Sequence, residues 1–381
     1  MRKIKTAVIG AGFMGKVHTE AIRRLGNVDV VAVCASPGRD AAKVGHTFDV
    51  PHSTGNWKTL VDDPEVEAVH LCTPNALHYP MAKAFLEAGK HVLCEKPLAT
   101  SYAEAKEMLD IARHKHLAHC TNHNLRYYPV VQHIRQMIEG GELGEILVVQ
   151  GTYSQDWLLY DTDFNWRIES KANGPSRVVG DIGSHWMDMI QHLTGLKITA
   201  LCANLQTFHK TRKRPKGSVE TFAGKTLQPD EYDEIPIETE DFASVLVELG
   251  ERARGAYTVS QVSAGNKNRF QIEIYGTKRG VKWNQEAPDE LWIGNRNSPN
   301  QLIVKDPSLL APKAAGYADL PGGHSEGYDD THKQVFKRFY HRVLHPTTHI
   351  EYPTFEDGVR GMKLIEKVLE SHQRRGWVDV G

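Results

Sequence analysis

The stretch AVIGAGFMGKVH, residues 7–18, decides the fold, and it lies near the start of the 381-residue chain. Its apolar run ends in Gly10, Gly12 and Gly15, and a helical pattern of apolar residues follows. Glycines at this spacing permit a tight turn, a close approach of the backbone to a pyrophosphate, and close packing of helix on strand. The positive end of the helix then faces the phosphates. The stretch therefore predicts a strand, a glycine-rich turn and a helix that together hold a dinucleotide.

The rest of residues 1–122 repeats this alternation of apolar runs and helical patterns. Strands are expected at 6–11, 28–35, 68–73, 91–97 and 117–122, and helices at 15–26, 78–89 and 101–115. Strands separated by helices of this length imply right-handed crossovers and a parallel sheet. We therefore expect an α/β, doubly wound Rossmann domain at residues 1–122.

Residues 123–381 have a different order of predicted strands and helices. Longer β-type runs are expected as strands at 145–154, 198–208, 242–250, 252–263, 269–276 and 279–284. Short turns join several of them, as in hairpins of an antiparallel sheet. Helices are expected at 127–144, at about 181–195 and at 355–376, the last packing back towards the first domain. The pattern predicts an α+β domain with a large open, mainly antiparallel sheet.

One long connection, residues 209–241, carries a basic block, His209 to Lys216, followed by an acidic one. Loops of this length are usually functional or disordered. We expect a solvated excursion here, and the alternative is an arm that contacts another subunit.

The bulk composition excludes several classes of partner. The formal net charge is −1, so no overall field would attract nucleic acid or an anionic membrane surface. No apolar run approaches the roughly 20 residues of a membrane span, and the few residues before the first strand leave no room for a signal peptide. Four of the five cysteines end apolar runs, and no spacing is typical of a zinc site. We expect a cytoplasmic protein with a small-molecule partner and no metal.

The end of the second predicted strand bears on the choice of dinucleotide. An NAD site usually has a carboxylate there for the ribose hydroxyls, whereas this chain has Ser36 and Arg39. A hydroxyl and a guanidinium could bind a 2′-phosphate through charge-assisted hydrogen bonds. The sequence therefore favours NADP, while NAD or dual use stays open, and Arg39 could instead face solvent.

Three further side chains suggest chemistry. Lys96 follows a parallel strand at the edge where open α/β sheets bind ligands. Asp181 and His185 are four residues apart, on one face of a predicted helix. Oxidation of a secondary alcohol needs a base for the hydroxyl proton, and the ordinary pKa of histidine suits that task. The alternatives are a surface lysine, an N-cap aspartate and a buried core histidine.

The motifs GAGFMGKVH (10–18), TPNALH (73–78), EKPLA (95–99) and GDIGSHWMDM (180–189) together resemble the glucose–fructose oxidoreductase, inositol dehydrogenase and rhizopine catabolism (Gfo/Idh/MocA) oxidoreductases. Residues 151–157, 269–281 and 321–328 are similar to the branch that contains levoglucosan dehydrogenase. The resemblance covers nearly the whole chain. It implies that Lys96, Asp181 and His185 form the catalytic set. His185 would exchange the hydroxyl proton, Lys96 would hydrogen-bond that oxygen, and Asp181 would orient the set.

The resemblance and the glycine turn also define a set of expected cofactor contacts. These are Gly10, Gly12, Phe13, Met14, Gly15, Ser36, Arg39, Thr73, Pro74, Asn75, His78, Glu95, Lys96, Trp166 and Arg167. The family motif often has a cis peptide before the residue equivalent to Pro97.

A polyol substrate needs many hydrogen-bonding groups and a flat apolar wall. The expected substrate contacts are Lys96, Arg126, Tyr153, Gln155, Trp157, Asp181, His185 and His324. Each has a simpler alternative: tryptophan is more often a packing residue, and Arg167 could pair with a carboxylate or contact a cofactor phosphate.

These observations favour an NAD(P)-dependent oxidoreductase that oxidises a secondary hydroxyl of a sugar, glycoside or cyclitol, or reduces the keto-sugar. One alternative is a glycosidase or lyase that retains NAD and acts through transient sugar oxidation. Another is a non-catalytic, cofactor-sensing regulator of the same fold. Because open sheets of this family pack between subunits, a homodimer or homotetramer is expected.

Overall fold

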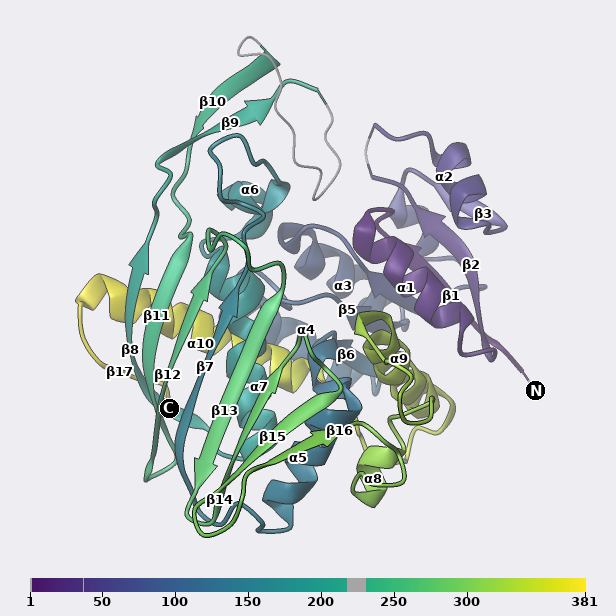
Figure 1. Ribbon diagram of the computed structural model, residues 1–381. Coiled ribbons are helices and arrows are strands. Elements are labelled where there is room, and N and C mark those ends of the chain that lie inside the picture. Colours follow the sequence, from purple (N-terminus) through teal and green to yellow (C-terminus); the bar gives the residue numbers. More distant parts are fainter. Residues whose placement is uncertain (1, 37, 218–230) are drawn as a thin grey trace. The chain divides into compact units, whose positions relative to one another are not determined.

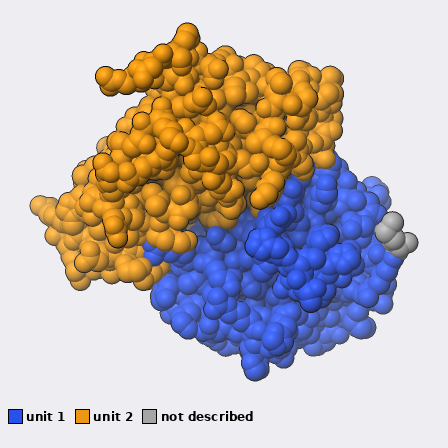
Figure 2. Space-filling view, turned by 90° about the horizontal axis from the view of Figure 1, so that it is seen from below, with its two compact units in different colours: residues 1–124, 329–362 blue, residues 125–328, 363–381 orange. Residues whose placement is uncertain are grey.

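The computed structural model describes residues 2–36, 38–217 and 231–381. The chain forms two compact units (Figure 2). The first unit contains residues 1–124 and 329–362, and the second contains residues 125–328 and 363–381. Both units are therefore assembled from two separate stretches of the sequence. The division of the chain at residue 122 stays a prediction.

The first unit is built on a six-stranded sheet in which every pair of neighbours is parallel (Figure 1). Its strand order is β3 (His52–Thr54), β2 (Val28–Cys34), β1 (Ile4–Ile9), β4 (Ala68–Leu71), β5 (His91–Cys94) and β6 (His119–Thr121). This order confirms the predicted doubly wound parallel sheet. The short strand β3 was not predicted, since its three residues carry no apolar run.

The helices of the first unit are α1 (Phe13–Arg23), α2 (Ala41–Phe48), α3 (His78–Glu87), α4 (Tyr102–His114) and, apart from its first residue, α9 (Tyr328–Leu344). Helix α9 was missed by the sequence analysis. Its buried face includes the polar residues Thr331, His332 and Gln334 beside the apolar ones. Polar residues at buried positions hide the apolar period that identifies a helix.

The second unit is built on a nine-stranded sheet (Figure 1). Its order is β16 (Gln301–Val304), β15 (Glu290–Asn295), β14 (Arg279–Asn284), β13 (Arg269–Gly276), β7 (Ile146–Ser154), β12 (Ala253–Ser260), β11 (Phe242–Leu249), β8 (Ile198–Gln206) and β17 (Val378–Asp379). Only the β12–β7 pair is parallel among these described pairs. The predicted large, mainly antiparallel sheet is therefore confirmed.

The helical elements of the second unit are α5 (Pro129–Glu139), α6 (Ser170–Asn173), a π-helical turn (Val179–Gly183), α7 (Ser184–Thr194) and α8 (Pro312–Ala315). Helix α10 (Phe355–Arg374) is shared between the units. Helix α7 packs on α5 and on strands β7 and β13 (Figure 1). Its Trp186 is fully buried and stacks on Tyr257 of β12, with ring centroids 4.4 Å apart. Helix α7 is thus fixed to the sheet by a large aromatic contact.

The long connection at 209–241 contains more order than we expected. Strands β9 (Thr211–Pro215) and β10 (Tyr232–Pro236) pair as an antiparallel ribbon, while residues 218–230 lie outside the described part. The basic block is also not wholly solvated. Arg212 is fully buried, because the Asp241 carboxylate and three backbone carbonyls accept hydrogen bonds from its guanidinium.

Among the described residues, every helix is too short or too polar to span a bilayer.

Candidate functional site

The loops that follow β1, β2, β4 and β5 all leave the same edge of the six-stranded sheet, because these strands are adjacent and parallel. The edge therefore gathers the glycine turn, Ser36, the 73–75 segment and Lys96. These residues are among those predicted to contact the cofactor.

The glycine turn tolerates no side chain at two of its three positions. Gly10 has φ +106°, and a Cβ there would lie 2.5 Å from the carbonyl oxygen of Cys72. A Cβ on Gly15 would lie 2.0 Å from the carbonyl oxygen of Gly10. Gly12, by contrast, faces open space with no atom within 4 Å of a built Cβ. Helix α1 follows Gly12 without a side-chain cap, so the turn has room for an anionic group at a helix N-terminus.

Arg39 lies against this turn. Its Nη1 donates a hydrogen bond of 2.9 Å to the carbonyl oxygen of Ala11, between the first two glycines. Ser36 is exposed nearby in sequence, and its carbonyl accepts a hydrogen bond from the Arg39 amide. The guanidinium of Arg39 is therefore held against the glycine turn. The alternative stated above was an Arg39 side chain that faces solvent.

The segment after β4 meets the segment after β5 through His78. One imidazole nitrogen of this fully buried residue lies 2.9 Å from the carbonyl oxygen of Pro97, and the other lies 2.9 Å from that of Thr73. Thr73 also has a buried hydroxyl without a hydrogen-bond partner among the described residues. Since buried hydroxyls are rarely left unsatisfied, this hydroxyl fits a contact with a bound ligand. The turn, Arg39 and Thr73 together suit a dinucleotide.

Lys96 is half-buried and follows Glu95, which is 7% exposed. The Lys96–Pro97 peptide bond is cis, as the resemblance implied. Oε1 of Glu95 accepts hydrogen bonds from Asn122 and lies 2.9 Å from Nε2 of His18. Burial raises the pKa of Glu95, but His18 and the Lys96 charge outweigh it and hold this pKa well below its usual range. Glu95 is therefore a buried, ionised carboxylate beside the candidate catalytic lysine.

In the second unit, Asp181 lies in the π-helical turn and His185 in the first turn of α7. The turn begins against Glu240, whose Oε1 accepts hydrogen bonds from the backbone amides of Arg177 and Val179 and from the hydroxyl of Ser176. Glu240 thus acts as an N-terminal cap contributed by a distant part of the chain. π-Helical turns inside helices are frequent at functional sites.

Both carboxylate oxygens of Asp181 have defined partners. Oδ1 accepts a hydrogen bond of 3.3 Å from Nε of Arg167, and Oδ2 accepts one of 2.8 Å from Nε2 of Gln261. Gln261 is fully buried, directly after β12. Gln261 was not predicted, since a glutamine 80 residues from Asp181 carries no motif. Arg167, predicted above to contact the cofactor, pairs here with a carboxylate, and its Cζ lies 4.4 Å from the centroid of the Trp166 ring.

His185 is 6% exposed, and its ring centroid lies 6.1 Å from that of Tyr153. The Tyr153 hydroxyl donates to Oδ1 of Asn268, which also accepts from Gln155, and Trp157 donates to Oε1 of Gln155. Burial and the nearby Asp181 charge raise the pKa of Tyr153 far above its usual value, so this phenol stays protonated. Three of the predicted substrate residues therefore form one hydrogen-bonded chain, joined by Asn268.

Two other predicted substrate residues have structural partners. Arg126 forms a buried ion pair with Asp188 of α7, with Nε 2.7 Å from Oδ2. His324 is exposed in a loop whose backbone is held by the buried Lys305, which donates to the His324 carbonyl and to Glu326. The roles of Arg126 and His324 towards a substrate stay predictions.

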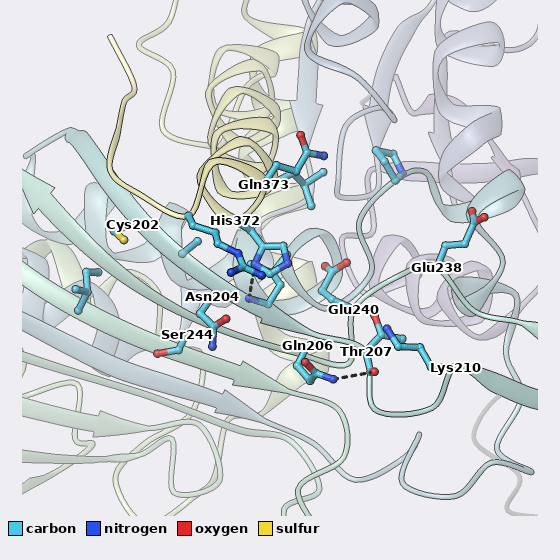
Figure 3. Close-up of a pocket in the computed structure, with 16 residues that line it drawn as sticks. Cys202, Asn204, Gln206, Thr207, Lys210, Glu238, Glu240, Ser244, His372 and Gln373 are labelled. Atoms are coloured by element: carbon cyan, nitrogen blue, oxygen red, sulfur yellow. Dashed lines mark hydrogen bonds between the residues drawn. The ribbon is translucent and has the colours of Figure 1, made fainter.

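A cavity of about 1030 Å³ lies elsewhere in the second unit (Figure 3). It is lined by Asn204 and Gln206 of β8, Ser244 of β11 and His372 of α10, among other residues. None of Asp181, His185 and Gln261 lines this cavity. It is therefore distinct from the candidate catalytic residues of the same unit.

Comparison with known proteins agrees with this fold. A family model described as an oxidoreductase family with an NAD-binding Rossmann fold matches residues 4–123, and the C-terminal domain model of the same family matches residues 131–282. The chain belongs to the Gfo/Idh/MocA oxidoreductase family. It is similar to levoglucosan dehydrogenase of Pseudarthrobacter phenanthrenivorans, with 29% identity over 100% of this chain and 99% of that one.

Solved structures of Gfo/Idh/MocA relatives extend the likeness to the whole fold. Levoglucosan dehydrogenase in complex with NADH and L-sorbose matches with a TM-score of 0.89 and 28% identity, over 100% of both chains. An inositol dehydrogenase homologue from Azotobacter vinelandii, complexed with NAD+, matches with a TM-score of 0.85 and 27% identity, over 99% of this chain and 97% of that one. As a member of the Gfo/Idh/MocA family, the chain is an NAD(P)-dependent dehydrogenase.

Proposed function

We propose that this dehydrogenase oxidises a secondary hydroxyl of a sugar, glycoside or cyclitol, or reduces the corresponding ketone, with Lys96, Asp181 and His185 as its catalytic set. The observation that carries the proposal is the fixed Asp181 carboxylate, held by Arg167 and Gln261, one helical turn before the buried His185. A carboxylate held in this way can orient an imidazole and stabilise its protonated form.

Each member of the set has one task. His185 takes the proton from the hydroxyl oxygen during oxidation, and returns it during reduction. Lys96 donates a hydrogen bond to the same oxygen and stabilises negative charge that develops there. The nicotinamide, when bound, supplies the acceptor for the hydride that leaves the carbon. Asp181 keeps the imidazole in the orientation and tautomer that can accept a proton.

The substrate class follows from the groups around His185. The chain of Tyr153, Asn268, Gln155 and Trp157 presents hydroxyl, amide and indole groups on one strand end and its neighbouring loops. Such a set suits a ligand with several hydroxyl groups and an apolar C–H face. The names of the relatives, which include a levoglucosan dehydrogenase and an inositol dehydrogenase homologue, support the same class.

A panel of hydroxylated substrates tests this function. Purified protein is mixed with NAD or NADP and with monosaccharides, anhydrosugars and cyclitols, and reduced nicotinamide is followed by absorbance. Steady formation of reduced cofactor with at least one of these compounds is expected, and simple secondary alcohols should react far more slowly. Activity confined to simple alcohols, or release of a cleaved glycoside without net reduction of cofactor, would contradict the proposal.

The proposed cofactor preference is for NADP. Arg39 is held over the glycine turn, and no carboxylate stands among residues 34–36 at the end of β2. Replacing Arg39 with alanine should raise the Kd for NADPH by about tenfold or more, and change that for NADH by less than about threefold. The expected ratio follows from loss of one charge-assisted contact to a phosphate. Fluorescence titration of both cofactors measures it, and an equal loss for both would refute the phosphate contact.

We also propose a homodimeric or homotetrameric, cytoplasmic enzyme. Val148, Leu246 and Leu302, on strands of the nine-stranded sheet, expose 41%, 49% and 61% of their surface. Exposed apolar side chains on a broad sheet are typical of a surface that another subunit covers. Sedimentation velocity tests this, and a monomer at micromolar concentration would contradict it.

A further inference from the structure

A buried polar cluster lies within the first unit, beside Lys96. It joins side chains from helices α1 and α9, strand β4 and the ends of β5 and β6. Its members are His18, His70, Glu95, Asn122, His332 and Tyr340, each at most 7% exposed. The sequence analysis assigned a role to Glu95 alone, as a cofactor contact.

Four of these groups form a hydrogen-bonded chain. The hydroxyl of Tyr340 lies 2.8 Å from Nε2 of His70, and Nδ1 of His70 lies 2.9 Å from Nδ1 of His18. Nε2 of His18 lies 2.9 Å from Oε1 of Glu95. The chain therefore runs from α9 through β4 and α1 to the carboxylate beside Lys96.

One end of the chain fixes the position of one proton. An ionised Glu95 can only accept, so Nε2 of His18 carries a proton and donates it. Nδ1 of His18 and Nδ1 of His70 form the next bond, in which one ring donates and the other accepts. Nε2 of His70 then bonds to the hydroxyl of Tyr340. Burial lowers the pKa of His70 well below its ordinary value, in agreement with a neutral ring.

The same cluster includes three groups that could bind a metal ion, His18, Glu95 and His332, with ligand atoms within 4.8 Å of one another. Nδ2 of Asn122, however, lies 3.2 Å from Nε2 of His18, 2.5 Å from Oε1 of Glu95 and 3.0 Å from Nδ1 of His332. The amide nitrogen thus occupies the position between the three groups that a cation would take. It also satisfies the carboxylate as a hydrogen-bond donor, so the geometry favours a polar network over a metal centre.

The second oxygen of the carboxylate accepts a hydrogen bond from the backbone of the candidate catalytic lysine. Oε2 of Glu95 lies 3.3 Å from the backbone nitrogen of Lys96, while Oε1 is taken by His18 and Asn122. A buried carboxylate is costly unless hydrogen bonds and an opposite charge compensate it. Here two donors fix its position and the adjacent lysine supplies the charge.

We propose that Glu95 is a positioning residue for Lys96, and that His18 and Asn122 hold its carboxylate in place for that purpose. The proposal rests on the catalytic role of Lys96 proposed above. In addition, we propose that the fixed Glu95 carboxylate keeps Lys96 in the position from which it acts. The position of this carboxylate depends in turn on the polar cluster, which extends to helix α9.

A double-mutant cycle tests the proposal, because a residue that acts through Lys96 has no effect on kcat once Lys96 is gone. Glu95→Gln keeps the shape of the side chain and removes its charge. In the parent enzyme we expect kcat to fall by about 10- to 100-fold, while KM for the sugar changes by less than about threefold. In the Lys96→Met background, the same substitution should lower the residual kcat by less than about twofold. Glu95→Asp, which restores the charge, should recover part of the loss.

Glu107→Gln is the matched control. Glu107 accepts hydrogen bonds from Lys83 and Tyr79 on the surface of the same unit, and this substitution should leave kcat within about twofold. If Glu95→Gln does not fold, Asn122→Ala takes its place, with a several-fold fall of kcat expected only when Lys96 is present.

The positioning role would be overturned if Glu95→Gln lowered kcat by the same factor in the parent enzyme and in the Lys96→Met background. It would also be overturned if Glu95→Gln left kcat unchanged in the parent enzyme. An unchanged kcat for Lys96→Met alone would instead overturn the proposed function of the lysine. This result can be distinguished from failure of the positioning role, because it is measured with Glu95 intact.

Discussion

Replacing His185 with alanine should lower kcat by at least about 100-fold, because a general base contributes roughly 10²- to 10⁴-fold to a proton transfer. His185 is buried, and lies one helical turn after an aspartate whose two carboxylate oxygens are both held. The fluorescence-derived Kd for NADPH should change little, since His185 is not among the proposed cofactor contacts. The measurement is kcat and KM, followed by absorbance of reduced nicotinamide, with the sugar of the panel that reacts fastest.

His192→Ala is the matched control for this variant. His192 lies two turns later in the same helix, where it contacts Gln132 and Arg135. Its replacement should leave kcat within about threefold. Turnover of His185→Ala close to that of the parent enzyme would remove this histidine from the mechanism.

The largest loss of stability is expected from Asp241→Asn. The carboxylate of Asp241 accepts hydrogen bonds from Arg177 and from Arg212, and all three side chains are fully buried. Removing the charge leaves two buried guanidinium groups without their shared anion. Breaking a buried pair by removing one partner typically costs about 3–5 kcal/mol. Urea unfolding followed by circular dichroism should therefore show a loss of about that size.

Asp233→Asn serves as the comparison. Asp233 lies on the ribbon strand β10, half-exposed and 3.8 Å from Arg214, and surface pairs of this kind contribute about 0–1 kcal/mol. If Asp241→Asn were as mild as Asp233→Asn, the buried cluster would not have the stabilising role that its burial implies.

The Asp241 contribution also has a defined pH dependence. Burial raises the pKa of this carboxyl, but the charges of Arg177 and Arg212 outweigh it, so the pKa in the folded protein lies below its ordinary value. A depressed carboxyl pKa stabilises the fold fully above the unfolded pKa of about 3.9 and loses that effect as the pH falls towards the folded pKa. The difference in unfolding free energy between the parent protein and Asp241→Asn should therefore shrink as the pH is lowered below about 4. If this difference in unfolding free energy grew as the pH was lowered, it would contradict the assignment of a negative charge to Asp241 in the folded protein.

This stability is relevant to the site because the cluster is continuous with it. Arg177 precedes the π-helical turn that holds Asp181, and its amide donates to Glu240. Arg212 donates to the carbonyl oxygens of Leu158 and Tyr160, in the segment that leads to Arg167. The turn that carries Asp181 and the segment that leads to its partner Arg167 are thus tied to the same buried charges.

The parts of the fold that depend on local residue spacing and periodicity could be predicted from the sequence. The glycine turn, the alternating helices and strands, and the runs that became β7, β11, β13 and β14 are encoded in spacing and periodicity. Strands β15 to β17 and helix α9 were missed. Short strands and polar buried faces give no clear periodic signal.

The candidate site was predictable only as a set of residue types. Lys96, Asp181 and His185 stand in recognisable motifs, but Gln261, Glu240 and Asn268 are ordinary polar residues far away in sequence. Their importance comes from the fold, which places an amide or a carboxylate against a particular oxygen or amide nitrogen. For the same reason no pattern showed that Arg212, within a basic block, would be buried against Asp241.

A crystal structure with NADPH and the preferred sugar bound would test the catalytic assignment most directly. We expect Nζ of Lys96 and a ring nitrogen of His185 both to lie within hydrogen-bond distance, about 2.6–3.2 Å, of one hydroxyl oxygen, and the carbon bearing this oxygen to face the nicotinamide. A sugar bound productively against the nicotinamide, with a different side chain on its reacting hydroxyl and His185 turned away from it, would show that the assignment is wrong.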